Sequence, residues 1–183
     1  MKLLPYLDDV IVRFEELRQL ADRAIAQLEP EQIFQTWDQE TNSIAITMKH
    51  ISGNMRSRWR DFLTSDGEKP DRYRDTEFEI HPSDTIESLN QQWEAGWKYL
   101  FDALKTLTPE DIDKTVLIRN EPHYVHQAIT RQLLHYGMHV GQIVFMAKHL
   151  ASDHWKSLTI PRGNSQDLNR KLGLNYTPKS EAK

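Results

Sequence analysis

The two histidines His135 and His139 are the residues of this chain whose type and spacing most clearly suggest chemistry. They lie four residues apart in a run with helical periodicity, so their imidazole rings stand one above the other on one helix face. A single helix can then offer two nitrogen ligands to one metal ion. A third ligand has to come from another helix, and its presence would separate a metal site from an ordinary helical bundle.

The pair by itself is weak evidence for a metal, because histidines that are buried and hydrogen-bonded are common in protein cores. Its surroundings on the helix are unusual, since polar groups replace the leucines of a plain core. These residues recur at spacings of four and three, which predicts one inward seam: Ala128, Gln132, His135, His139, Gln142, Met146 and His149. Buried polar groups need partners. A divalent metal would serve both rings, whereas the expected helices place no acid on a facing inward stripe.

Four long helices are predicted to position this seam, because apolar residues recur every three or four positions in four stretches. The stretches cover about residues 5–28, 42–63, 85–107 and 124–150. Asp84 and Glu87 are typical of a capping box before the third helix. A short helix is expected at Thr108–Asp111, and Thr115–Arg119 is β-prone and predicts a short extended piece.

The connection between the second and third helices, residues 64–82, is charged and long for a compact domain. Such connections are often functional.

The second helix carries a polar stripe beside its apolar seam, and two interpretations of that stripe stay open. Its members are small or polar and include one imidazole: Ser43, Thr47, His50, Asn54 and Ser57. The stripe is either a solvated helix face or the wall of a polar cavity inside a bundle. Periodicity favours the solvated face, because His50 stands more than about 90° from the centre of the apolar seam.

Composition excludes several classes of protein. The chain has 183 residues and a net charge of −4, which suits one soluble domain with a tail. No basic stripe predicts a nucleic-acid partner, and no apolar run approaches the roughly 20 residues that span a bilayer. Acidic residues follow the first apolar residues, where a signal peptide would continue its apolar core, so a cytoplasmic location is expected. The chain has no cysteine, so any thiol chemistry needs a thiol from a substrate or cofactor.

Two motifs resemble those of the DinB/YfiT-like superfamily. The run His135-Tyr-Gly-Met-His139-Val-Gly-Gln142-Ile143 is similar to its metal-binding helix. The run Met48-Lys-His50-Ile-Ser-Gly-Asn54-Met-Arg-Ser-Arg-Trp59 resembles the second-helix segment that supplies another histidine. The resemblance covers about residues 1–165, including the Leu158–Gly163 segment of one subgroup. It therefore predicts a bundle domain over residues 1–165 and a polar C-terminal tail over residues 166–183.

The resemblance implies an all-α, up-down-down-up four-helix bundle with short extra helices or strand pieces in its connections. Such proteins are usually homodimers and hold a metal with one histidine from helix 2 and two from helix 4. Carried over by position, the ligands are His50, His135 and His139. Three neutral ligands leave a coordination position open, as in catalytic sites, and zinc or nickel is expected. Gly137 and Gly141 lie on another face of helix 4, and they indicate close approach of a second backbone, such as that of a second copy across a dimer interface.

Characterised relatives of this superfamily include S-transferases and isomerases that use low-molecular-weight thiols such as bacillithiol or mycothiol. The chain is therefore expected to be a metal-dependent enzyme of this kind acting on a small molecule. Two alternatives stay open, a metal-dependent hydrolase and a non-catalytic helical dimer of a stress response. Asn54, Gln142 and Arg162 are candidates for lining the pocket or orienting a ligand, although each also suits an ordinary structural or surface position. No carboxylate presents itself as a general base.

Overall fold

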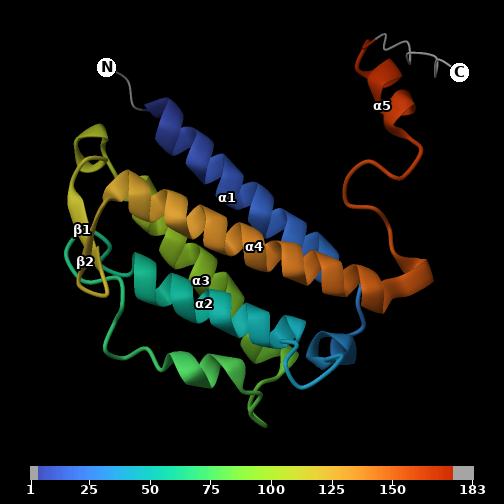
Figure 1. Ribbon diagram of the computed structural model, residues 1–183, viewed down its shortest axis with the longest axis horizontal. Coiled ribbons are helices and arrows are strands. Elements are labelled where there is room, and N and C mark those ends of the chain that lie inside the picture. Colours follow the sequence, from blue (N-terminus) through green and yellow to red (C-terminus); the bar gives the residue numbers. More distant parts are fainter. Residues whose placement is uncertain (1–3, 175–183) are drawn as a thin grey trace, which may run out of the picture.

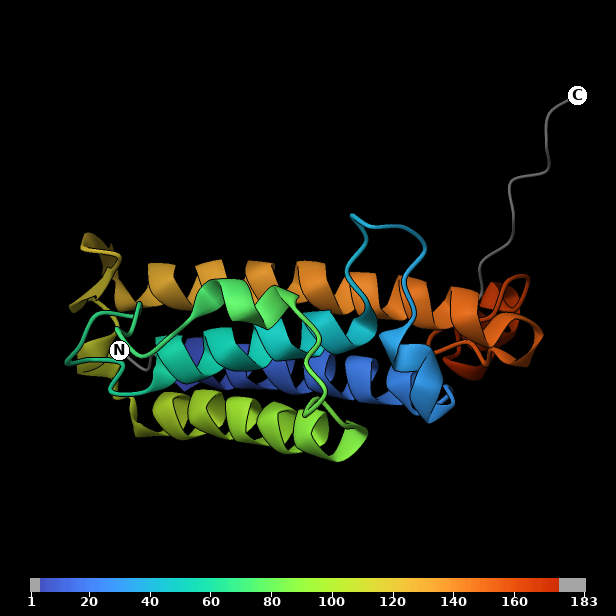
Figure 2. The ribbon, with the colours of Figure 1, turned by 90° about the horizontal axis from the view of Figure 1, so that it is seen from below.

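The computed structural model describes residues 4–174 and is mostly helical, with five α-helices and a two-stranded sheet (Figure 1). Four long helices lie side by side in both ribbon views (Figures 1 and 2). They are α1 (Leu4–Ile25), α2 (Ile44–Trp59), α3 (Ile86–Thr106) and α4 (Val125–Ala151). A short helix, α5 (Ser165–Lys171), follows beyond the end of α4. All but its first residue fall within the expected tail, residues 166–183, and the structure describes that tail only as far as residue 174.

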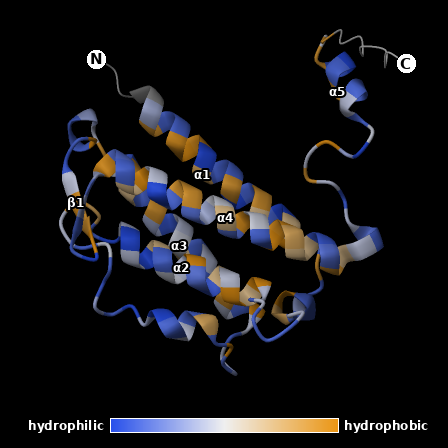
Figure 3. Cartoon of the chain, in the orientation of Figure 1, coloured by the Kyte–Doolittle hydropathy of each residue, from blue (hydrophilic) through white to orange (hydrophobic). Residues whose placement is uncertain are grey.

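The long helices share one apolar core. Helix α2 packs mainly against α3, α1 packs against α4, and α4 also contacts α2. Figure 3 shows apolar residues recurring along each of these helices between hydrophilic ones. Phe14, Trp97 and Tyr136 are among the largest fully buried side chains. Gly96 lets α3 approach α2 closely, because a Cβ there would lie 3.1 Å from the Cα of Ser52.

Two details of the predicted helix ends are wrong, for local reasons. The second helix ends at Trp59 and not at 63, because Asp61 takes a left-handed φ of 49° that no helix continues through. The third helix is capped by Thr85 and Ser88, which exchange side-chain and backbone hydrogen bonds. Asp84 is unavailable as the cap because its Oδ2 accepts hydrogen bonds from Lys49 Nζ at 2.7 Å and from the backbone of His81 at 2.8 Å.

A β-hairpin precedes α4. Its first strand, β1 (Thr115–Ile118), confirms the extended piece predicted from the sequence, whereas its antiparallel partner β2 (Glu121–Tyr124) was not predicted. The tight turn uses Arg119 and Asn120, both with positive φ, as a two-residue hairpin turn of type I′ requires. The short helix expected near residue 109 is the 3-10 helix η3 (Pro109–Asp111).

The long connection after α2 covers the polar stripe of that helix. Its 3-10 helix η2 (Arg74–Phe78) packs against α2, and Figures 1 and 2 show it lying beside that helix. Ser57 Oγ donates to the carbonyl of Gly67 and accepts from the backbone N–H of Lys69. Every residue of the stripe is buried, so the solvated-face interpretation is wrong.

No helix within residues 4–174 is both long enough and apolar enough to span a membrane.

Candidate metal centre

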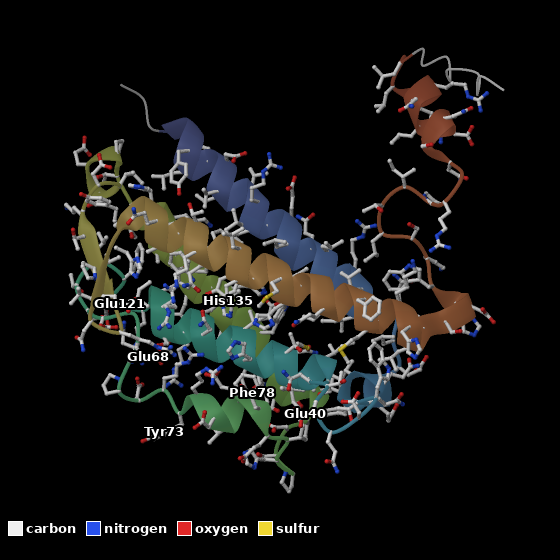
Figure 4. All side chains as sticks on the ribbon, viewed as in Figure 1. Glu40, Glu68, Tyr73, Phe78, Glu121 and His135 are labelled. Atoms are coloured by element: carbon white, nitrogen blue, oxygen red, sulfur yellow. The ribbon has the colours of Figure 1, made fainter. Side chains whose placement is uncertain are left out.

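Three histidines from two helices converge at one point. His50 comes from α2, and His135 and His139 come from α4. The Nε2 atom of His135 lies 3.4 Å from Nε2 of His50 and 3.1 Å from Nε2 of His139. One ring nitrogen from each of the three residues lies within 4.8 Å of the others, so the group could hold a metal ion. Figure 4 shows His135 between α4 and α2.

The spacing of these nitrogens suits a transition-metal ion. Zinc–imidazole bonds of about 2.0–2.1 Å at a tetrahedral angle place neighbouring ligand nitrogens about 3.3 Å apart. The two measured Nε2–Nε2 distances of 3.1 and 3.4 Å bracket that value. Three neutral nitrogens also match the donor set of catalytic sites, which leave a position open for another ligand. The residues therefore fit the ion that the resemblance implies.

The outer nitrogens of two rings are held by side-chain acceptors. The Nδ1 atom of His50 lies 2.9 Å from Glu77 Oε2, and Nδ1 of His139 lies 2.8 Å from Gln142 Oε1. A carboxylate or amide oxygen accepts a hydrogen here, so Nδ1 carries the proton and Nε2 keeps its lone pair for a metal. Hydrogen bonds of this kind fix the tautomer and the ring orientation in metal-binding histidines.

Glu77 is the functional residue that the sequence analysis missed. It lies in η2, and its carboxylate accepts two hydrogen bonds from Arg72. Arg72 Nε donates to Oε1 and Arg72 Nη2 donates to Oε2, both at 2.8 Å. Gly53 on α2 makes room for it, because a Cβ there would lie 2.2 Å from Glu77 Oε1. The long charged connection was recognised as a functional candidate, but no periodicity indicated which of its acids turns inward.

Burial lowers the pKa of the two histidines on α4. The pKa of His135 is lowered to about 3, first by burial and then by the neighbouring His139 and His50. Burial also lowers the pKa of His139, although its hydrogen bond with Gln142 opposes that shift. Burial by itself would raise the pKa of Glu77, but the hydrogen bonds from Arg72 and His50 outweigh it and the pKa is lowered. The site thus combines an ionised carboxylate at Glu77 with neutral imidazoles at His135 and His139.

The three supporting residues proposed from the sequence take different positions. Asn54 is buried, lines a cavity with His50 and His135, and accepts a hydrogen bond from the hydroxyl of Tyr136 at 2.9 Å. Gln142 is more exposed and bonds His139. Arg162 is exposed in the segment after α4 and is not among the residues that line this cavity. The structure therefore brings two of the three to the histidines.

Fold and site together define a mostly helical protein with a three-histidine group able to hold a metal ion. Comparison with protein families gives a match over residues 3–164 to a family described as "Protein of unknown function (DUF1572)". The chain belongs to this family. Searches of curated proteins and of solved structures found no match.

Proposed function

We propose that this protein is a metal-dependent enzyme in which His50, His135 and His139 bind a divalent transition metal, zinc or nickel. The observation that carries the proposal is the convergence of three Nε2 atoms at metal-ligand spacing. Supporting it, Glu77 and Gln142 hold the outer nitrogens of two of these rings. Histidines on a solvated surface need no buried partner such as the Glu77 carboxylate, which Arg72 in turn holds in place.

The reaction that we propose is transfer of a low-molecular-weight thiol to an electrophilic small molecule. A divalent ion with three neutral ligands supplies Lewis acidity, which lowers the pKa of a thiol or of water at its open position. The chain contains no cysteine, so the thiol has to come from a cosubstrate. Glu77 already accepts hydrogen bonds from both Arg72 and His50, so it is a poor acceptor for a further proton. Its role is to orient His50. The proton of the thiol would therefore pass to solvent. As the thiolate sulfur forms a bond to the electrophilic carbon, the bond from that carbon to its leaving group would break, and the leaving group would depart with the electron pair.

The fold that we propose for this enzyme is a DinB-like bundle over residues 1–165 with up-down-down-up topology. In the ribbon views, α1 and α4 begin at the end of the molecule that carries the hairpin and run away from it (Figures 1 and 2). Helices α2 and α3 run back toward that end. The DUF1572 match, which ends at residue 164, supports the domain limit.

A homodimer is part of the proposal, and one face of α4 supports it. Leu134, Met138 and Phe145 are 71%, 56% and 65% exposed, and they form one stripe with Gly137 and Gly141. Within the described chain, nothing lies within 4 Å of a Cβ built at either glycine. A second copy would bury this stripe, and the glycines would let the two backbones approach closely. Light scattering should then give the mass of a dimer for the wild type and of a monomer for Met138→Glu.

Turnover tests the reaction. Protein loaded with zinc or nickel is assayed against a panel of electrophiles with and without an added low-molecular-weight thiol. The proposal predicts product only with both metal and thiol, and loss of product in His139→Ala but not in His154→Ala, an exposed histidine outside the cluster. Turnover that needs metal but no thiol would instead indicate metal-dependent hydrolysis. Full biological effect in a His139→Ala strain would indicate a non-catalytic role.

A further inference from the structure

A cavity beside the three histidines is lined by arginines. It has a volume of about 220 Å³, and His50, His135, Asn54 and Gln132 form part of its wall. The rest of its lining consists of five guanidinium side chains from four parts of the chain: Arg58, Arg72, Arg74, Arg119 and Arg131. No carboxylate lines it among the described residues. A cavity with this lining favours an anion next to the proposed metal.

Two of these arginines are buried and held rigidly. The side chains of Arg58 and Arg72 are 7% and 4% exposed, respectively. Arg58 donates to the carbonyl of Gly67 and, through Nη2 at 3.0 Å, to Glu68 Oε2. Arg72 is fixed by its two hydrogen bonds to Glu77. Because their positions are set before any ligand arrives, these guanidinium groups lose little entropy when an anion binds.

Separate elements bring the more exposed arginines to the same cavity. Arg119 lies in the hairpin turn. Its backbone N–H donates to Asp66 Oδ1 at 2.9 Å, and its side-chain Nε donates to Glu68 Oε2 at 3.0 Å. Arg74 stacks over the Phe78 ring at 4.8 Å. Arg131 lies on α4, one turn before His135. Glu68 joins α2 to the hairpin, because its Oε2 accepts hydrogen bonds from both Arg58 and Arg119, and Figure 4 shows it near these two elements.

The arginines outnumber the acids that pair with them. Glu68 pairs with Arg58, Arg72 and Arg119, while Glu77 pairs with Arg72. The third acid, Asp75, is fully exposed and lies 3.8 Å from Arg74. Three carboxylates therefore face five guanidinium groups, and Arg131 has no ion pair within residues 4–174. The excess positive charge matches a ligand with two negative charges.

Two buried polar atoms in the cavity wall also lack partners. Within the described residues, Nε of Arg58 and Oε1 of Gln132 are buried without a hydrogen bond, and Gln132 is only 4% exposed. An unpaired buried polar group costs about 1–3 kcal/mol, so such groups commonly mark a place for a ligand or an ordered water. An anionic oxygen of a ligand would satisfy the donor, Nε of Arg58, and a ligand group or an ordered water would satisfy the acceptor, Oε1 of Gln132.

We propose that this cavity binds the oxyanion group of a small, doubly negative substrate, a phosphate monoester or a dicarboxylate. The arginines hold the oxyanion, and His50 and His135 in the same wall place the reacting part of the molecule at the metal. The placement of the reacting part rests on the proposed function, whereas binding of the anion does not. The volume of about 220 Å³ limits the ligand to a compact molecule.

Calorimetry on metal-free protein tests the cavity without involving the metal. Inorganic phosphate and succinate are each titrated into the wild type, Arg131→Gln and Arg74→Gln, in a buffer of low ionic strength. Arg13→Gln is the matched control, because it removes one exposed guanidinium on α1 whose ion pairs within residues 4–174 are with Asp9 and Glu16. We expect saturable binding of at least one anion, weakened about tenfold by each cavity substitution and unchanged in the control.

The outcomes separate this inference from the proposed function. Phosphate binding without succinate binding assigns a phosphate group, the reverse assigns a dicarboxylate, and binding of both supports the shared oxyanion site. If neither anion binds the wild type, or if all three arginine variants bind alike, the anion site is refuted. His139→Ala should keep anion binding while losing metal. A wild type that binds anions but no metal would overturn the metal-dependent function and leave the anion site standing.

Discussion

The carboxylate of Glu77 should contribute to metal affinity although it does not reach the metal itself. Its Oε2 accepts from His50 Nδ1 at 2.9 Å and from Arg72 Nη2 at 2.8 Å, while Oε1 accepts from Arg72 Nε. In Glu77→Gln, one of these two oxygens becomes an NH2 group. If the remaining oxygen accepts from His50, the NH2 group points its hydrogens at the Nε–H of Arg72. If the amide is rotated by 180°, the NH2 group points its hydrogens at the Nδ1–H of His50. The substituted side chain cannot satisfy all three N–H donors in either orientation.

The expected loss is 10- to 100-fold in zinc affinity, the usual effect of losing an outer carboxylate partner of a metal-binding histidine. That range equals about 1.4–2.8 kcal/mol of binding free energy. Competition with a chromophoric chelator at pH 7.5 measures it. Glu94→Gln is the matched control, because Glu94 is 60% exposed and, in the part of the chain that the structure describes, its ion pair is with Arg18 on the outer surface. Circular dichroism and a thermal melt establish that each variant is folded before its affinity is compared.

A zinc affinity within twofold of the wild type for a folded Glu77→Gln protein would refute this reasoning. His50 would then be oriented by packing alone, and the hydrogen bond to Glu77 would be incidental. A loss of affinity equal in Glu77→Gln and Glu94→Gln would also refute it, because only the first side chain contacts a histidine of the site.

Other substitutions and conditions test further parts of the site. Gly53→Ala should weaken zinc binding as Glu77→Gln does, because the new Cβ would overlap a carboxylate that cannot move without losing its partners; chelator competition measures it, and unchanged affinity would contradict the packing. Tyr136→Phe should lower the free energy of unfolding by about 1–3 kcal/mol, since it leaves buried Asn54 short of a donor; urea unfolding tests this, and zinc content should not change. Metal-free protein should lose stability as the pH falls from 6.5 toward 3, because the unfolded state protonates His135 in that window and the folded state does not. The slope from this ring is at most about 1.4 kcal/mol per pH unit, and His135→Gln should flatten it.

The helices and two of the three histidines could be predicted because helical periodicity is a local property. The three- and four-residue spacing along α4 placed His135 and His139 on one seam with Gln132 and Met146, which are buried. Two other members of that predicted inward seam, Gln142 and His149, are exposed. Periodicity gave the wrong environment for His50, which is 5% exposed. A helix pattern records where apolar neighbours lie, and the cover over His50 is a charged, irregular segment.

The remaining features depend on contacts between distant parts of the chain. Glu77 reaches His50 from a 3-10 helix 27 residues later, and nothing in its local sequence distinguishes it from the other acids of that segment. The strand β2 contains Pro122, which is unfavourable in a strand, and forms only because β1 pairs with it. The arginine cavity likewise joins α2, η2, the hairpin and α4, so its residues share no spacing in the sequence.

Elemental analysis of the protein purified without a histidine tag tests the metal site most directly. Cells are grown with added zinc and nickel, and the metal bound per chain is measured for the wild type, His139→Ala and His154→Ala. We expect about one equivalent of a single transition metal in the wild type and in His154→Ala, and loss of that metal in a His139→Ala protein that stays helical. Less than about 0.2 equivalents in the wild type, or unchanged metal in His139→Ala, would contradict a metal centre at these three histidines.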